Sequence, residues 1–303
     1  MYESVTRQIF CVDKKFSRGR KTYSCSHRLH KAVLALDVIY FYNIVYNTFM
    51  RFNFFEEYPT FENLEKAKLI DFKSTIFLTA NSFNEYKENK KLLTSINSNI
   101  STAYWPIIPN SYWISPFSNT KDLQNFIKEI FSINEPLTVL IDLELPLMKH
   151  KELYFKNFFS FWKNKKIIKK FFQEALSHNI NIVTAEYPPF FIGINLIYRL
   201  LGISFNVKKY KHTQCIMYYT SMISNKLKLK LIRNEITKVR KLNPNLQLGL
   251  GTIAVGVLGD EPILSIESLK NDIDFMKVNN IKTGIIFRLG GLNENYIKLL
   301  NNK

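Results

Sequence analysis

The chain has 303 residues, of which 46% are hydrophobic, and a formal net charge of +17. This length and apolar content are enough for one large domain with a buried core, and they exclude a chain that is disordered throughout. The positive charge raises the question of a nucleic-acid partner. Lysine, asparagine and isoleucine are abundant along the whole chain, however, so we expect the lysines to lie on solvated helix faces and no nucleic acid to bind.

The cysteines and histidines are scattered along the chain. Cys11, Cys25 and Cys215 show no CxxC spacing, and His27 and His30, three residues apart in a basic segment, lack obvious partners as metal ligands. This pattern indicates neither a zinc site nor a disulfide framework, and it favours a reducing, cytoplasmic compartment. We therefore predict no bound metal and no cofactor.

Residues 1–73 differ in composition from the rest of the chain. Residues 1–31 are basic and lack the apolar run of a cleaved signal peptide. Residues 32–50 are apolar and long enough to cross a bilayer, but Asp37 alone costs about 2.5 to 3.5 kcal/mol near a helix centre. We expect this aromatic-rich extension to pack on the main domain or to complete it, and a membrane anchor is the less favoured alternative.

From residue 74 onward, short apolar runs alternate with amphipathic stretches. Strands are predicted at residues 75–80, 102–108, 137–144, 180–186, 214–219, 246–253 and 283–289. Helices are predicted at residues 61–69, 84–96 and 265–279, within residues 190–204, and at the carboxyl terminus. Three more are predicted with one bound each: one begins at Asn119 or Thr120, one ends near His178, and one ends at Leu242.

Apolar strands joined by helical crossovers are typical of a parallel sheet that is covered on both faces. Such a sheet is found in doubly wound folds and in closed (β/α)8 barrels, also called TIM barrels. No glycine-rich phosphate-binding loop follows the first strand, which favours a barrel over residues 74–303. Only seven strands are counted there. The eighth is expected between about Val38 and Phe54, unless the barrel is incomplete.

Carboxylates end two of the predicted strands. Asp142 and Glu144 are two residues apart, so both side chains should point into the mouth of the barrel, and Glu186 ends the next strand. Acids are placed at the end of apolar strands mainly where they meet a cleft, a metal or a cation, because their desolvation is costly. Two further acids, Asp260 and Glu261, are expected in a loop at the rim.

Aromatic side chains surround these strand ends. Tyr104 and Trp105 lie on the second predicted strand, Tyr187 follows Glu186, and Tyr219 ends another strand. Aromatic faces stack on sugars, so we expect these four residues to bind a carbohydrate substrate. Arg288, at the end of the last strand, is expected to bind substrate or to form an ion pair with one of the acids.

The sequence Asp142-Leu-Glu144 resembles the end of the DxxDxDxE signature of chitinase-type glycoside hydrolases, and the DxE of lysozyme-like barrels. The two earlier acidic positions of the chitinase signature are Leu137 and Leu140 in this chain. The resemblance implies a barrel that acts on a glycan or glycoside. In that reaction Glu144 would be the proton donor, and Asp142 would tune the acidity of Glu144. Glu186 would be the second carboxylate or a substrate ligand.

Two other functions are compatible with the same residues. One is a barrel without catalysis that binds a carbohydrate or a protein partner. The other is a metal-dependent phosphodiesterase, which is disfavoured because no histidine ends a strand. Convergence of Asp142, Glu144 and Glu186 in one cleft would favour the hydrolase, and burial would then raise the pKa of Glu144 unless Arg288 lay between the acids.

Overall fold

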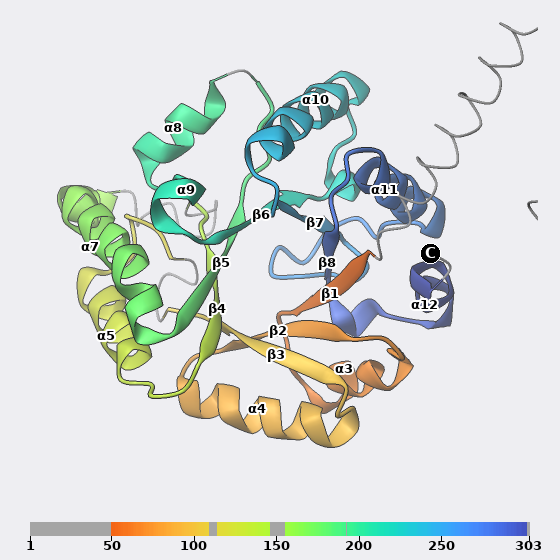
Figure 1. Cartoon of the computed structure of the whole chain (residues 1–303), viewed down its shortest axis with the longest axis horizontal. Coiled ribbons are helices and arrows are strands. Elements are labelled where there is room, and N and C mark those ends of the chain that lie inside the picture. Colours follow the sequence, from red (N-terminus) through yellow and green to blue (C-terminus); the bar gives the residue numbers. More distant parts are fainter. Residues whose placement is uncertain (1–49, 109–113, 146–154, 192, 302–303) are drawn as a thin grey trace, which may run out of the picture. The chain divides into compact units, whose positions relative to one another are not determined.

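The computed structural model describes residues 50–108, 114–145, 155–191 and 193–301. They belong to one compact unit, Phe49–Lys303. Eight strands form a closed barrel in the order β1 to β8, every neighbouring pair is parallel, and helices surround the barrel (Figure 1). The predicted (β/α)8 barrel is therefore confirmed, and it is complete.

The elements alternate along the chain as predicted. The strands are β1 (Arg51–Glu56), β2 (Ser74–Ala80), β3 (Ile100–Pro106), β4 (Leu137–Asp142), β5 (Ile180–Glu186), β6 (Thr213–Tyr218), β7 (Gln247–Gly251) and β8 (Thr283–Phe287). The α-helices are α3 (Phe61–Glu65), α4 (Phe83–Ile96), α5 (Thr120–Phe131), α7 (Phe161–Glu174), α8 (Ile194–Leu201), α9 (Val207–Tyr210), α10 (Lys226–Leu242), α11 (Ile266–Val278) and α12 (Glu294–Asn301). Short 3-10 helices are η1 (Lys66–Leu69), η3 (Phe158–Ser160), η4 (Ala175–His178), η5 (Thr220–Met222) and η6 (Leu289–Gly291).

Side-chain caps begin several helices at the predicted places. The Ser82 side chain accepts a hydrogen bond from the backbone N–H of Glu85 at the start of α4. Asn119 accepts from the backbone N–H groups of Lys121 and Asp122 at the start of α5. These bonds satisfy donors that the first helical turn leaves without a partner, which is why a short polar residue stands at each boundary.

The first strand closes the barrel. β1 pairs with β2 on one side and with β8 on the other. Residues 51–56 therefore supply the eighth strand from within the extension 1–73. Residues 32–49 of the apolar segment lie outside the described residues. Among the residues that are described, no helix is long and apolar enough to cross a membrane.

Two apolar clusters lie on the two faces of the sheet. The larger one fills the space between the barrel and the helices and includes Phe52, Phe54 and Ile76. The smaller one fills the barrel interior and includes Phe55 and Phe77. Successive residues of a strand point to opposite faces, so each strand contributes to both clusters. This alternation decides which strand-end side chains can reach the barrel mouth.

Glycines on β7 leave room for two large rings inside the barrel. A Cβ atom on Gly251 would lie 3.3 Å from the ring of Tyr219 and 3.2 Å from Cβ of Phe287. A Cβ atom on Gly249 would likewise lie 3.3 Å from the Tyr219 ring. Bulkier residues at these positions would displace Tyr219 from the place that it occupies next to the barrel mouth.

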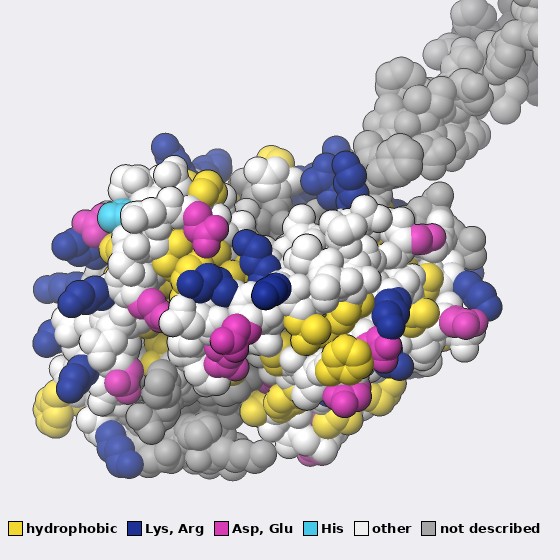
Figure 2. All heavy atoms as spheres, turned by 90° about the horizontal axis from the view of Figure 1, so that it is seen from below, with side chains coloured by type: hydrophobic (Ala, Val, Ile, Leu, Met, Phe, Trp, Pro, Cys, Tyr) yellow, Lys and Arg dark blue, Asp and Glu magenta, His cyan; other side chains and the backbone are white. Residues whose placement is uncertain are grey.

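The lysine-rich helix α7 exposes most of its charge. Lys163, Lys166 and Lys170 are exposed, whereas Lys165 is buried and donates a hydrogen bond to the backbone oxygen of Leu200 (2.6 Å). On the side of the molecule seen from below Figure 1, lysine and arginine side chains are interspersed with acidic ones (Figure 2).

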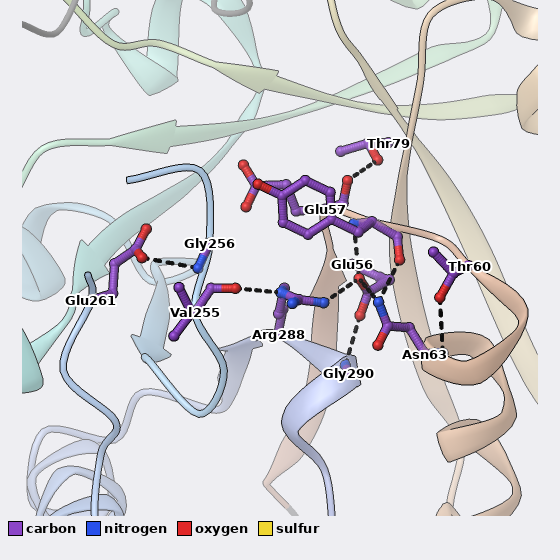
Figure 3. Close-up of polar contacts among 11 residues, drawn as sticks. Glu56, Glu57, Thr60, Asn63, Thr79, Val255, Gly256, Glu261, Arg288 and Gly290 are labelled. Atoms are coloured by element: carbon purple, nitrogen blue, oxygen red, sulfur yellow. Dashed lines mark hydrogen bonds and ion pairs between the residues drawn. The ribbon is translucent and has the colours of Figure 1, made fainter. Parts of the chain in front are cut away.

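Glu56, the last residue of β1, joins three segments at the barrel mouth. Its buried carboxylate accepts hydrogen bonds from Arg288 Nη1 (2.9 Å) and from the backbone N–H groups of Tyr58 (2.8 Å) and Gly290 (2.7 Å). Asn63 Nδ2 lies 3.4 Å from the same carboxylate (Figure 3). Burial raises the pKa of Glu56, and Arg288 and the two backbone donors oppose that rise. The ion pair thus connects β1 to the segment after β8.

We expect Glu56→Ala to lower the free energy of unfolding by about 3 to 5 kcal/mol, because it leaves Arg288 as a partly buried charge without its partner. The matched control is Glu65→Ala. Glu65 forms an exposed ion pair with Lys68, and its loss should cost less than about 1 kcal/mol. Urea unfolding of both variants measures the difference, and equal losses would contradict a special role of Glu56 in barrel closure.

Candidate active site

A cavity of about 350 Å³ opens where the strands end. Four acids line it: Glu57, Asp142, Glu144 and Glu261. Aromatic side chains form much of the remaining wall, among them Trp105, Tyr187, Phe190, Tyr198, Tyr219 and Phe287. In parallel barrels, ligands bind to the loops at the carboxyl ends of the strands. A concave apolar site with a few polar groups is suited to a small ligand.

Asp142 and Glu144 point into this cavity from the end of β4. Asp142 is buried, Glu144 is half-buried, and Leu140, two residues earlier, lines the same cavity. The two acids share a face of the chain because strand side chains alternate with a period of two. Tyr187 donates a hydrogen bond to the Glu144 carboxyl group.

Burial keeps both carboxyl groups protonated to an unusually high pH. Burial, followed by the negative charge of Glu57, raises the pKa of Glu144 to about 7, while the hydrogen bond from Tyr187 opposes the rise. Burial, Glu144 and Glu57 raise the pKa of Asp142 well above its usual range. The two groups interact, so the protons belong to the Asp142–Glu144 pair rather than to one residue.

Glu57 is the third acid of this group and is not among the residues predicted from the sequence. It follows β1 and is buried, and its backbone oxygen accepts a hydrogen bond from Thr79 Oγ1 (2.6 Å) (Figure 3). Gly256 leaves it room, because a Cβ atom there would lie 2.8 Å from Glu57 Oε2. The available signal was an acidic pair, Glu56 and Glu57, directly after the alternating polar and apolar residues 51–55.

Glu186 does not join the acids in the cavity, contrary to the expectation from the sequence. Asp142 pairs in register with Ala185, and Ala185 lines the cavity, so the next residue points to the opposite face of β5. The buried Glu186 carboxylate accepts hydrogen bonds from Thr184 Oγ1 (2.9 Å) and Gln214 Nε2 (2.8 Å). These contacts make it part of a polar cluster outside the barrel interior.

Three of the four aromatic residues expected to bind substrate line the cavity: Trp105, Tyr187 and Tyr219. Tyr104 does not line it. Its ring is buried on the other face of β3 and stacks on Tyr86, with 5.0 Å between ring centroids. The same strand parity explains the difference, since adjacent residues cannot both face the barrel interior.

Arg288 is also placed away from the cavity acids. It pairs with Glu56, and its Nε donates to the backbone oxygen of Val255 (3.0 Å) (Figure 3). Its guanidinium lies 4.8 Å from the centre of the Tyr58 ring. It is not among the residues that line the cavity. Arg288 therefore does not cancel the rise in the pKa of Glu144.

Glu261 organises the loop that borders the cavity. Its carboxylate accepts a hydrogen bond from the backbone N–H of Gly256 (3.0 Å) (Figure 3). It also accepts from the backbone N–H groups of Leu258 (3.0 Å) and Gly259 (3.1 Å). These bonds turn its oxygens toward the loop. In the described part of the chain, no group of three or more His, Cys, Asp or Glu side chains is arranged to hold a metal ion.

Comparison with known proteins shows likeness in fold rather than in sequence. No family model and no curated protein sequence matches the chain. Among solved structures, a class V chitinase from Nicotiana tobaccum has a TM-score of 0.53 at 9% identity, covering 84% of this chain and 99% of that chain. A variant of a GH18 chitinase from Cycas revoluta, in complex with (GlcNAc)4, has a TM-score of 0.52 at 10% identity, covering 82% and 98%.

The spore cortex-lytic enzyme SleL from Bacillus cereus is similar at the same level, with a TM-score of 0.50 at 11% identity, covering 83% of this chain and 73% of that chain. The chain therefore shares its (β/α)8 barrel architecture with these three enzymes. At these identities the likeness establishes the barrel architecture, and the chemistry has to be argued from the side chains in the cavity.

The raised pKa of Glu144 predicts a pH-dependent stability. The folded protein holds the Glu144 proton more tightly than the unfolded chain, whose glutamates have a pKa near 4.5. The contribution of this proton to the free energy of unfolding is therefore complete below pH 4.5 and is lost as the pH rises through about 7. We expect Glu144→Gln to raise the free energy of unfolding by about 2 kcal/mol at pH 8 and by much less at pH 5. Urea unfolding at both pH values measures this.

The control for that measurement is Glu88→Gln, because Glu88 is exposed on α4. It should leave the pH dependence of stability unchanged. A Glu144→Gln variant whose stability differs from that of the parent protein by the same amount at pH 5 and pH 8 would contradict the raised pKa.

Proposed function

We propose that the barrel hydrolyses a glycosidic bond, with Glu144 as the proton donor. The observation that carries the proposal is a carboxyl group with a pKa of about 7 in an aromatic-walled cavity at the carboxyl ends of the barrel strands. A general acid works best when its pKa lies near the working pH, because the group is then protonated and still able to release its proton. An ordinary glutamate would be ionised at neutral pH.

Glu57 and Asp142 complete the proposed acid and base machinery. Glu144 donates its proton to the glycosidic oxygen as the bond to the sugar carbon breaks, and water adds to that carbon. The proton released by this water passes to a carboxylate and returns to Glu144. Glu57 is the second carboxylate of the cavity and takes the place that the sequence suggested for Glu186. Asp142 tunes the acidity of Glu144, because the charges of the two groups disfavour each other.

The cavity walls support a carbohydrate as the substrate. Trp105, Tyr187 and Tyr219 present aromatic surfaces next to the three acids. Sugar rings have apolar faces that stack on such surfaces, while their hydroxyl groups bond to carboxyl groups. Because one structural neighbour contains (GlcNAc)4, oligomers of N-acetylglucosamine are the first substrates to test.

A sugar-binding barrel without catalysis is the second candidate. It is favoured by Leu137 and Leu140, which stand where the chitinase signature has acids. Leu140 lines the cavity directly beneath Asp142, so one polar contact of that signature is replaced by an apolar one. Binding of the oligosaccharide without turnover by the unmodified chain would support this candidate over hydrolysis.

The test is turnover of N-acetylglucosamine oligomers and a panel of fluorogenic glycosides by the full chain. We expect Glu144→Gln to lower kcat about 10²-fold to 10⁴-fold, because it removes the proton donor while keeping the shape of the side chain. The matched control is Asp260→Asn on the exposed rim loop, which should retain kcat. Unchanged kcat in Glu144→Gln would refute its role as the proton donor.

A further inference from the structure

Aromatic side chains stand exposed around one part of the barrel mouth. In the segment that leads into α7 and in its first turn, Phe155 is 84% exposed, Phe158 64%, Phe159 93% and Trp162 65%. Phe190 and Phe191, in the segment after β5, are exposed as well. We call these six residues the aromatic rim. Such a concentration of large apolar side chains in water is unusual for a soluble surface and marks a binding surface.

The rim lies on one end of the barrel. Its residues follow β4 and β5, which are neighbours in the sheet, so both segments emerge at the same part of the mouth (Figure 1). Leu227 and Leu231, in the first turns of α10 after β6, extend this exposed apolar surface. At the far ends of the helices, exposed apolar residues such as Leu242 and Val278 stand singly.

The same part of the chain is strongly basic. Residues 155–166, which carry most of the rim aromatics, contain four lysines and no acid. Lys156, Lys163 and Lys166 are exposed among the rim aromatics, and Glu186 is buried away from them. Aromatic side chains together with lysines would suit a binding partner that carries negative charge at its surface and has an apolar interior just below it.

We propose that the aromatic rim docks on an anionic lipid bilayer. Aromatic rings prefer the headgroup region of a bilayer, and each lysine near an anionic surface contributes about 1 kcal/mol of attraction. An apolar groove on a partner protein would explain the exposed aromatic rings but not the lysines among them. An anionic bilayer explains both, so it is the better binding partner.

The rim is continuous with the cavity. Phe190 belongs to the rim and also lines the cavity, and Lys228, which lines it too, lies with Nζ 5.7 Å from the Phe190 ring centre. A bilayer seated on the rim would therefore meet the opening of the cavity. The docking surface does not depend on the proposed chemistry, since none of its residues is assigned to proton transfer.

The test is co-sedimentation of the full chain with vesicles of phosphatidylcholine, with and without phosphatidylglycerol. We expect binding to the anionic vesicles to be at least tenfold tighter than to the neutral ones and to weaken with salt. The double variant Phe159→Ser/Trp162→Ser should lose binding at least tenfold. The control Leu242→Ser/Val278→Ser removes exposed apolar side chains at the opposite end and should bind like the unmodified chain.

Each of three results would overturn the proposal. The first is no preference of the unmodified chain for anionic vesicles. The second is equal binding by the Phe159→Ser/Trp162→Ser variant, which would assign the contact to another part of the chain. The third is self-association without lipid that this variant abolishes, which would make the rim a protein interface. Circular dichroism of both double variants confirms that the comparison is between folded proteins.

Discussion

Closure of the sheet between β1 and β8 is the constraint on which the barrel mouth depends. β1 pairs with β8 from Arg51 to Phe55, and the ion pair between Glu56 and Arg288 continues this connection beyond the last ladder bonds. Without β1 the sheet would have two open edges. The next residue, Glu57, enters the cavity only because β1 holds its position between β2 and β8.

Placing acids in this cavity lowers the stability of the folded protein. Asp142 is buried and Glu144 is half-buried, and both lie beside the charge of Glu57 in surroundings that are largely apolar. Desolvation and repulsion both favour the protonated forms, so the site stores a proton near neutral pH. A neutral isostere would relieve this cost and would also remove the acid, a conflict between stability and function that is common at active sites.

Periodicity in the sequence was sufficient to predict the architecture and much of the site. Each strand from β2 to β8 begins and ends within two residues of its predicted bounds, because continuous apolar runs and helix caps are local signals. Asp142 and Glu144 reach the cavity together because their spacing of two is independent of the rest of the sheet.

The errors arise from relations between strands, which a single sequence does not show. Whether Glu186 or Ala185 faces the interior depends on the register of β5 against β4, and the same parity separates Tyr104 from Trp105. Glu57 escaped prediction because it lies just beyond the span, residues 38–54, in which the first strand was sought.

The proposed chemistry requires the Asp142–Glu144 pair to hold a proton at neutral pH under the influence of Glu57. The decisive experiment is NMR titration of the Glu144 side-chain carboxyl carbon, in the unmodified chain and in Glu57→Gln. We expect an apparent pKa near 7 in the unmodified chain and a lower value in Glu57→Gln, since a negative neighbour has been removed. An apparent pKa near 4.5 in the unmodified chain, with no change in the variant, would contradict it.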